Sequence, residues 1–312
     1  MHCLVKMCYP LHKHLFGGRM MGFMSNVAVV TDSNSGITQA QAVMCRVHVL
    51  PMPIIINGEQ FFEDISITQE MFYEKLMEDT DVRTSQPAIG DVLDCWETLL
   101  LEYDELVHIP MSSGLSAAYE TAATLARDFG GRVQVVNNQR ISVTQRQSAL
   151  DAVSLSDRGW DANRIKEYLE EIKFDSSIYI MLDTLKYLKK GGRITPAGAA
   201  IGTLLNIKPI LQINGDKLDA YAKARGTKQA KTVMIDAMKN DFNGRFKEFS
   251  GPGHMWLQAA YTYDRAAADE FIKEVEAVFM GYEIHVDPLS LSVSCHIGPG
   301  ALALACSKKI MV

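Results

Sequence analysis

A cluster of hydroxyl side chains at a predicted strand-to-helix junction is the part of this sequence best suited to binding a ligand. Residues 106–109 are predicted to form a buried strand, and an Ala-rich helix is predicted from Ala117 to Arg127. Between them lie Ser112, Ser113 and Ser116. The first turn of a helix presents unpaired backbone N–H groups and a partial positive charge. Because the serines add neutral donors there, we interpret the cluster as a site for a small anion such as a carboxylate or phosphate.

The main alternatives for these serines are helix capping and nucleophilic catalysis. Capping accounts for one serine but not for all three. A nucleophilic serine needs a base that a third group orients, and the sequence here is not a Gly-x-Ser-x-Gly elbow. His108 lies within the preceding strand and is interpreted as a core histidine. We therefore favour anion binding, with a serine hydrolase of lipid esters or a small phosphotransferase as the enzymatic alternative.

A second pair of hydroxyls lies in the segment Thr84-Ser85-Gln86-Pro87. Ser85 is predicted to cap the helix that follows, and Pro87 suits the first turn of that helix. Thr84 lies one residue further from the helix and is free to point into a cleft. An ordinary capping segment is the alternative.

The remaining candidate ligand-binding residues, Arg193 and His296, lie in two glycine-rich motifs. The glycines of Gly191-Gly192-Arg193 are expected to end a helix in a left-handed turn, and Arg193 either binds an anion or lies on a solvated basic face. The turn at residues 296–300 (His-Ile-Gly-Pro-Gly) allows a close backbone approach. His296 either donates a hydrogen bond to an anion there or is an ordinary loop histidine. A helix of small residues is predicted after this turn, from Ala301 to Cys306.

The elements that must position these motifs alternate between strand and helix in the first half of the chain. This alternation implies crossover connections and a mostly parallel sheet. In the second half, Asn214-Gly215 is a strong hairpin signal and predicts a mixed sheet. We therefore predict an α/β protein of two domains, residues 25–173 and 174–312, after a disordered extension of residues 1–24. The predicted strands are 27–31, 106–109, 133–136, 178–182, 210–213, 217–222, 256–261 and 283–286, and residues 47–56 are predicted to be extended with interruptions at Pro51 and Pro53. Ser66 and Gln69 are predicted to form a capping box before a helix that runs to about residue 78.

Composition excludes several classes of protein. The 312-residue chain has a net charge of −6 and no basic block, which argues against nucleic-acid binding. Its six cysteines have no short paired spacing, so we expect neither a zinc site nor disulfides, but reduced thiols in the cytoplasm. No apolar run approaches the roughly 20 residues of a membrane span. The 16 methionines would suit an adaptable lipid pocket, as would Leu204, Leu205, Ile207 and Ile210, although core packing explains these four equally well.

Five segments, taken in order, resemble the DegV family. They are residues 29–33 (Val-Val-Thr-Asp-Ser), 84–87, 112–116, 188–193 and 296–300, and the resemblance runs from about residue 26 to 307. It implies a two-domain fold and a non-catalytic carrier that holds one long-chain fatty acid, such as palmitate, stearate or oleate, in a buried tunnel between the domains. It also implies that the carrier presents the carboxyl group to a fatty acid kinase for bacterial phospholipid synthesis.

The same resemblance implies which residues surround the carboxylate. Neutral hydroxyls and a helix N-terminus would hold this group without a buried ion pair, and the tail would gain about 0.8 kcal/mol per buried methylene. No metal or further cofactor is implied, and we expect a monomer. The resemblance assigns the motif threonine to Thr84 and the motif serine to Ser113, with Arg193 and His296 at the remaining polar positions. Together with Ser112, Gly114 and Ser116 of the serine cluster, these are the predicted ligand-binding residues.

The chain departs from the family pattern close to these residues. Ala117-Ala118 stands where Gly-Thr is usual, and Asn137-Asn138 stands where an Asp-Ser pair is usual. These changes remove a flexible glycine and a hydroxyl near the head group. A binding protein for another amphiphilic anion is therefore a third hypothesis.

Overall fold

The first sheet is fully parallel, as the alternation of strands and helices predicts. The structure is a computed structural model that describes residues 26–78, 80–192, 207–213 and 217–311. The strand order is β2-β1-β6-β7. The strands are β1 (Val27–Asp32), β2 (His48–Leu50), β6 (Glu105–Ile109) and β7 (Val133–Val135), and the helices around them are α1 (Gln39–Cys45), α3 (Ile89–Leu99), α4 (Ala118–Leu125), α5 (Ser142–Asp157) and α6 (Ala162–Glu171).

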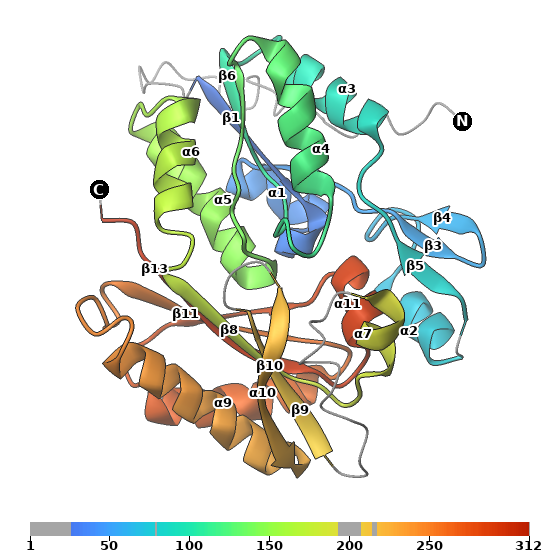
Figure 1. Ribbon diagram of the computed structural model, residues 1–312, viewed down its shortest axis with the longest axis vertical. Helices are drawn as coiled ribbons and strands as arrows, with labels where there is room; N and C mark the ends of the chain where they lie inside the picture. The colour runs from blue at the N-terminus through green and yellow to red at the C-terminus, as the bar shows by residue number, and fades with distance from the viewer. Residues whose placement is uncertain (1–25, 79, 193–206, 214–216, 312) are drawn as a thin grey trace.

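Helices cover both faces of this sheet (Figure 1). Side chains of β1 alternate between the faces, so Val27 and Val29 pack with α1, α5 and α6, whereas Ala28 and Val30 pack with α3 and α4. Every residue of β1 is buried. This is the environment in which a parallel strand is a continuous apolar run.

The second sheet has six strands and is mixed, in the order β10-β9-β8-β13-β11-β12. Its pairs are antiparallel except for β11 with β12. Helices α9 and α10 cover the face turned away from the first sheet, and α5 packs against the opposite face (Figure 1). The elements are β8 (Ser176–Met181), β9 (Ile207–Ile213), β10 (Leu218–Arg225), α9 (Gly226–Asn243), β11 (Met255–Tyr261), α10 (Arg265–Val278), β12 (Ile284–Pro288) and β13 (Leu302–Lys308).

A third, small antiparallel sheet that the sequence analysis missed lies beside two short helices. Its order is β4-β3-β5, and α2 packs with it. Figure 1 shows this sheet and α2 on the same side of the molecule as α7 and α11. The elements are β3 (Ile54–Ile56), β4 (Glu59–Phe61), α2 (Gln69–Met77), β5 (Val82–Thr84), α7 (Lys186–Gly191) and α11 (Leu291–Ile297).

The helix predicted from Ala301 to Cys306 is wrong, because five of these residues lie in strand β13. This strand pairs with both β8 and β11 in the middle of the second sheet. Alanine favours a helix in isolation, but two flanking strands supply ladder hydrogen bonds that override this weak preference.

Two predicted helix caps are also wrong. Thr68, not Ser66, caps α2: its side chain accepts a hydrogen bond from Met71 N–H, whereas Ser66 Oγ accepts from Phe62 N–H in the preceding turn. Helix α3 begins only at Ile89, too far along the chain for Ser85 to cap it, and has no side-chain cap.

The predictions for the extension 1–24 and for the turn Asn214-Gly215 fall outside the described residues. The antiparallel pairing of β9 with β10 on either side of that turn is confirmed. All strands of the first sheet precede residue 136 and all strands of the second follow residue 175. The domain boundary near residue 174 stays a prediction. No helix among the described residues is long and apolar enough to span a membrane.

Candidate functional site

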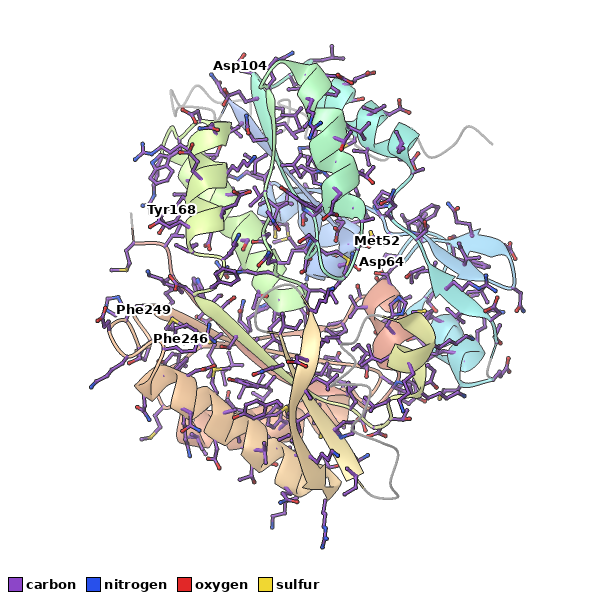
Figure 2. The ribbon with its side chains drawn as sticks, in the orientation of Figure 1. Met52, Asp64, Asp104, Tyr168, Phe246 and Phe249 are labelled. Carbon is purple, nitrogen blue, oxygen red and sulfur yellow. The ribbon has the colours of Figure 1, made fainter. Side chains whose placement is uncertain are left out.

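A cavity of about 440 Å³ lies where the two larger sheets and the small sheet meet. Met52 of its wall lies at the level where these layers join (Figure 2). Among the described residues of the wall, His296 is the single ionisable side chain, and the other residues are apolar or carry neutral hydroxyl or amide groups. The wall consists of Asn34, Met52, Thr84, Ser85, Gln86, Met111, Leu115, Ser116, Ala117, Ile141, Leu188, Leu218, Ser292, Val293, His296 and Ile297.

Thr84 and His296 meet in the wall although 212 residues separate them. The hydroxyl Oγ1 of Thr84 lies 2.8 Å from His296 Nε2. Thr84 ends strand β5, and His296 lies in the last turn of α11. The structure therefore brings together two of the polar groups that the sequence analysis proposed.

Two glycines allow α7 and α11 to approach each other closely at this point. A Cβ atom on Gly191 would lie 2.3 Å from His296 Nδ1, and a Cβ on Gly298 would lie 2.2 Å from Tyr187 Cδ2. Gly192, with φ of +68°, ends α7 in a left-handed turn. The close approach and the left-handed turn that were predicted for these motifs are confirmed, and they place the His296 imidazole against the cavity.

The serine segment contributes Ser116 to the wall. Its Oγ accepts a hydrogen bond from Ala118 N–H at 3.2 Å, which leaves the hydroxyl proton for another acceptor. Ser113 Oγ donates to Asn137 Oδ1 at 3.2 Å, and Ser112 is fully buried. Ser112, Ser113 and Gly114 are not among the residues of the cavity wall. Arg193 lies outside the described residues.

Helix α11 carries a polar residue that the sequence analysis missed, Ser292. It lies one turn before His296, and its Oγ donates to Asn34 Oδ1 at 2.6 Å. Asn34 in turn donates to Asp32 Oδ1 at 2.8 Å, and burial raises the pKa of Asp32. The repeated serines at 290, 292 and 294, just before the histidine, were the signal in the sequence that could have indicated this helix.

Helix α2 and the segment that follows β4 hold the other end of α11. Glu63 accepts a hydrogen bond at 2.9 Å from the backbone N–H of Leu291, the first residue of α11. Burial raises the pKa of Glu63 to about 8. Tyr73 OH donates to Ser294 Oγ at 3.0 Å. The position of His296 thus depends on contacts at both ends of its helix.

His108 is a core residue, as the sequence analysis proposed. It is buried, it packs edge-on against Trp96, and burial lowers its pKa to about 3. It is therefore neutral at physiological pH. No group of three or more His, Cys, Asp or Glu residues in the described chain could hold a metal ion.

Solved structures share this architecture. A DegV family protein from Thermus thermophilus, described as binding fatty acid, superposes with a TM-score of 0.81 at 28% identity, over 91% of this chain and 99% of that one. DegV from Bacillus subtilis, described as a fatty acid binding protein, superposes with a TM-score of 0.78 at 28% identity, over 92% of this chain and all of that one.

Sequence relatives lead to the same family. A DegV domain-containing protein of Staphylococcus aureus is 28% identical over 291 residues, which span 92% of this chain and 100% of the relative. The model of the DegV family of uncharacterised proteins matches residues 26–309. Because this match covers nearly the whole chain, and because the two-domain fold agrees, the chain belongs to the DegV family.

Proposed function

We propose that this protein is a non-catalytic carrier of one long-chain fatty acid. The observation that carries the proposal is the cavity wall, which is largely apolar and carries the paired Thr84 and His296 together with the hydroxyl of Ser116. Two relatives of the same fold, at 28% identity, are described as binding fatty acids. An acyl chain fits the apolar part of the wall, and a carboxylate fits the polar part.

The chemistry of the polar groups suits a carboxylate. When His296 carries its proton on Nε2, it donates to Thr84 Oγ1, and the threonine proton is then free for the ligand. Ser116 offers a second proton from the segment before α4, where the partial positive charge of the helix also favours an anion. A 16-carbon tail would add about 10 kcal/mol before the ordering costs of binding.

Presentation of the carboxyl group to a fatty acid kinase is the second part of the proposal. It follows the family resemblance, and it fits the exposure of Ser85, which lies in the wall beside Thr84. We envisage a monomeric carrier in the bacterial cytoplasm. Incubation with a bacterial fatty acid kinase, ATP and palmitate is expected to yield acyl phosphate only when this protein is present.

The first test of the carrier is native mass spectrometry of the purified protein, followed by lipid extraction. We expect one adduct of fatty-acid mass, released as free acid. In delipidated protein, Thr84→Ala should weaken palmitate binding about tenfold or more, since a hydrogen bond to a charged group is lost. Thr124→Ala is the matched control, because Thr124 is exposed on α4 and outside the cavity wall.

A pair of serine variants identifies the head-group serine. Ser116→Ala is expected to weaken binding more than Ser113→Ala, because the Ser113 proton is used by Asn137. Wild-type protein that binds neither palmitate nor oleate would refute the carrier. Hydrolysis of a lipid ester that is lost in either serine variant would establish the hydrolase instead.

A further inference from the structure

The cavity wall contains two side-chain amides, Asn34 and Gln86, and their hydrogen bonding differs. Asn34 has no N–H left for an anionic ligand: Nδ2 donates to Asp32 Oδ1 and to Met111 Sδ, while Oδ1 accepts from Ser292. It is almost fully buried. This amide therefore joins the first sheet to α11.

Only one end of the Gln86 amide makes a hydrogen bond within the described residues. Its Oε1 accepts a hydrogen bond from Thr121 Oγ1 of α4 at 3.1 Å. Its Nε2 group has no hydrogen-bond partner among the described residues. In this bond the acceptor end of the amide faces Thr121, so the two N–H groups of Nε2 lie at the end turned away from Thr121. Gln86 lies in the same wall as Thr84 and Ser116, so these donors are available where the head group would lie.

We propose that Gln86 is a specificity-determining residue that selects ligands ending in a carboxylate over ligands ending in a neutral hydroxyl. This inference rests on the proposed carrier function and deepens it. Thr84, Ser116 and His296 can each donate or accept a hydrogen bond, so they tolerate an alcohol as well as an acid. The Nε2 group of Gln86 only donates. A carboxylate offers two charged oxygens to such donors and forms the stronger, charge-assisted bonds.

Thr121 is assigned the role of a positioning residue for this amide. It reaches Gln86 from α4, the helix that follows the serine segment, and it does not line the cavity itself. Without its hydroxyl the amide can turn, and either end of the group can then face the ligand. The preference for acid over alcohol should therefore decline in Thr121→Val even though no wall residue has changed.

The test compares two ligands of equal length, myristate and 1-tetradecanol, on delipidated full-length protein at pH 8. Gln86→Glu keeps the shape and the bond from Thr121 but replaces the donor by a negative charge. We expect myristate affinity to fall about tenfold or more, with tetradecanol affinity changing less than threefold. Gln86→Met, which removes the amide without adding charge, should lower myristate affinity several-fold and provides the same test if the Glu variant does not fold.

Controls separate this inference from the carrier function. Gln60→Glu adds the same charge at an exposed position of β4 and should change neither affinity. Wild-type protein that binds no myristate would refute the carrier itself. Wild-type protein that binds myristate, together with an unchanged affinity in Gln86→Glu and Gln86→Met, would overturn the role of Gln86 alone. An equal loss for both ligands would also overturn it, because this result indicates a distorted cavity.

Discussion

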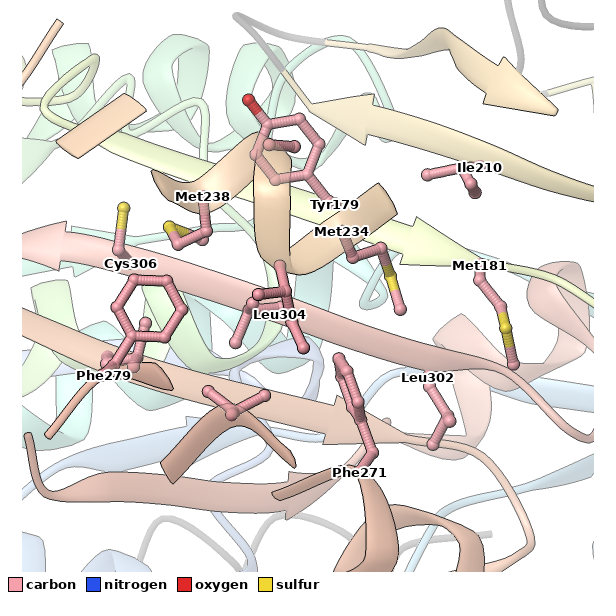
Figure 3. Close-up of a cluster of buried hydrophobic side chains, with 14 of the residues drawn as sticks. Tyr179, Met181, Ile210, Met234, Met238, Phe271, Phe279, Leu302, Leu304 and Cys306 are labelled. Carbon is pink, nitrogen blue, oxygen red and sulfur yellow. The ribbon is translucent and has the colours of Figure 1, made fainter. Parts of the chain in front are cut away.

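The two faces of the six-stranded sheet are built from the same strands but differ in side-chain size. On the face covered by α9 and α10, methionines and aromatic rings fill the core (Figure 3). On the opposite face, the small residues Ala303 and Ala305 of β13 lie among aliphatic side chains, and α5 and the cavity lie on this side of the sheet. The period of two along each strand therefore separates a closely filled core from the face on which the ligand site is built.

Because of this difference, a high number of methionines does not by itself indicate a lipid pocket. Met181, Met234 and Met238 lie in the core behind the sheet, whereas Met52 and Met111 line the cavity. Ile210, a candidate for the lipid pocket from sequence, also lies in that core, and Leu204 and Leu205 fall outside the described residues. A count of methionines in the sequence does not distinguish these two locations.

The largest expected effect is loss of stability from the core face. Phe271→Ala removes a buried ring in contact with the core of α9 and α10 and should lower the free energy of unfolding by about 3–5 kcal/mol. Leu218→Ala, on the cavity face, borders a space that already exists and should cost less. Urea unfolding of the delipidated proteins measures both. Equal losses would show that the two faces are equally well packed.

A second, smaller effect concerns the pH dependence of stability at Glu63, which holds the first residue of α11. Because burial raises the pKa of Glu63 to about 8, the folded protein keeps this proton while the unfolded chain releases it near the ordinary value of 4.5. The folded state is therefore destabilised progressively as pH rises from about 4.5 to about 8. Glu63→Gln keeps an acceptor for Leu291 N–H and removes this penalty.

The expected result is that Glu63→Gln becomes more stable than wild type as pH rises from 5 to 8, by about 2 kcal/mol or more at pH 8. Urea unfolding at several pH values provides the measurement. Because the comparison is between the two proteins at each pH, other buried acids such as Asp151 contribute equally to both. A difference that does not vary with pH would show that Glu63 is ionised in the folded protein.

The smallest effect tests the glycine contact behind His296. Gly191→Ala places a Cβ where the imidazole now lies and should displace the ring from Thr84. We expect palmitate affinity to fall about tenfold, or roughly 1.4 kcal/mol, with a free energy of unfolding close to that of wild type. Gly90→Ala in α3 is the control, because a Cβ there meets no atom within 4 Å. Unchanged affinity would mean that the ring adjusts without losing its function.

Much of the fold could be predicted because hydrophobic periodicity is a local property of the chain. The strand–helix alternation of the first sheet and the Asn-Gly turn signal between β9 and β10 both arise from patterns within a few residues. Strand β13 could not be identified, because its alanines favour a helix locally and the ladder to β8 and β11 decides otherwise. Helix α11, only seven residues long, is too short to produce a clear periodic pattern.

The amino-acid sequence is enough to identify the family, the alternation of strands and helices, and the types of residue available to a ligand. Which of these residues meet depends on the tertiary fold. The pairing of Thr84 with His296, the place of Ser116 rather than Ser113 in the wall, and the donor left free on Gln86 all depend on contacts between distant segments. These hydrogen bonds form because crossover connections and close glycine contacts bring distant elements together. The distances between such elements cannot be read from the local sequence.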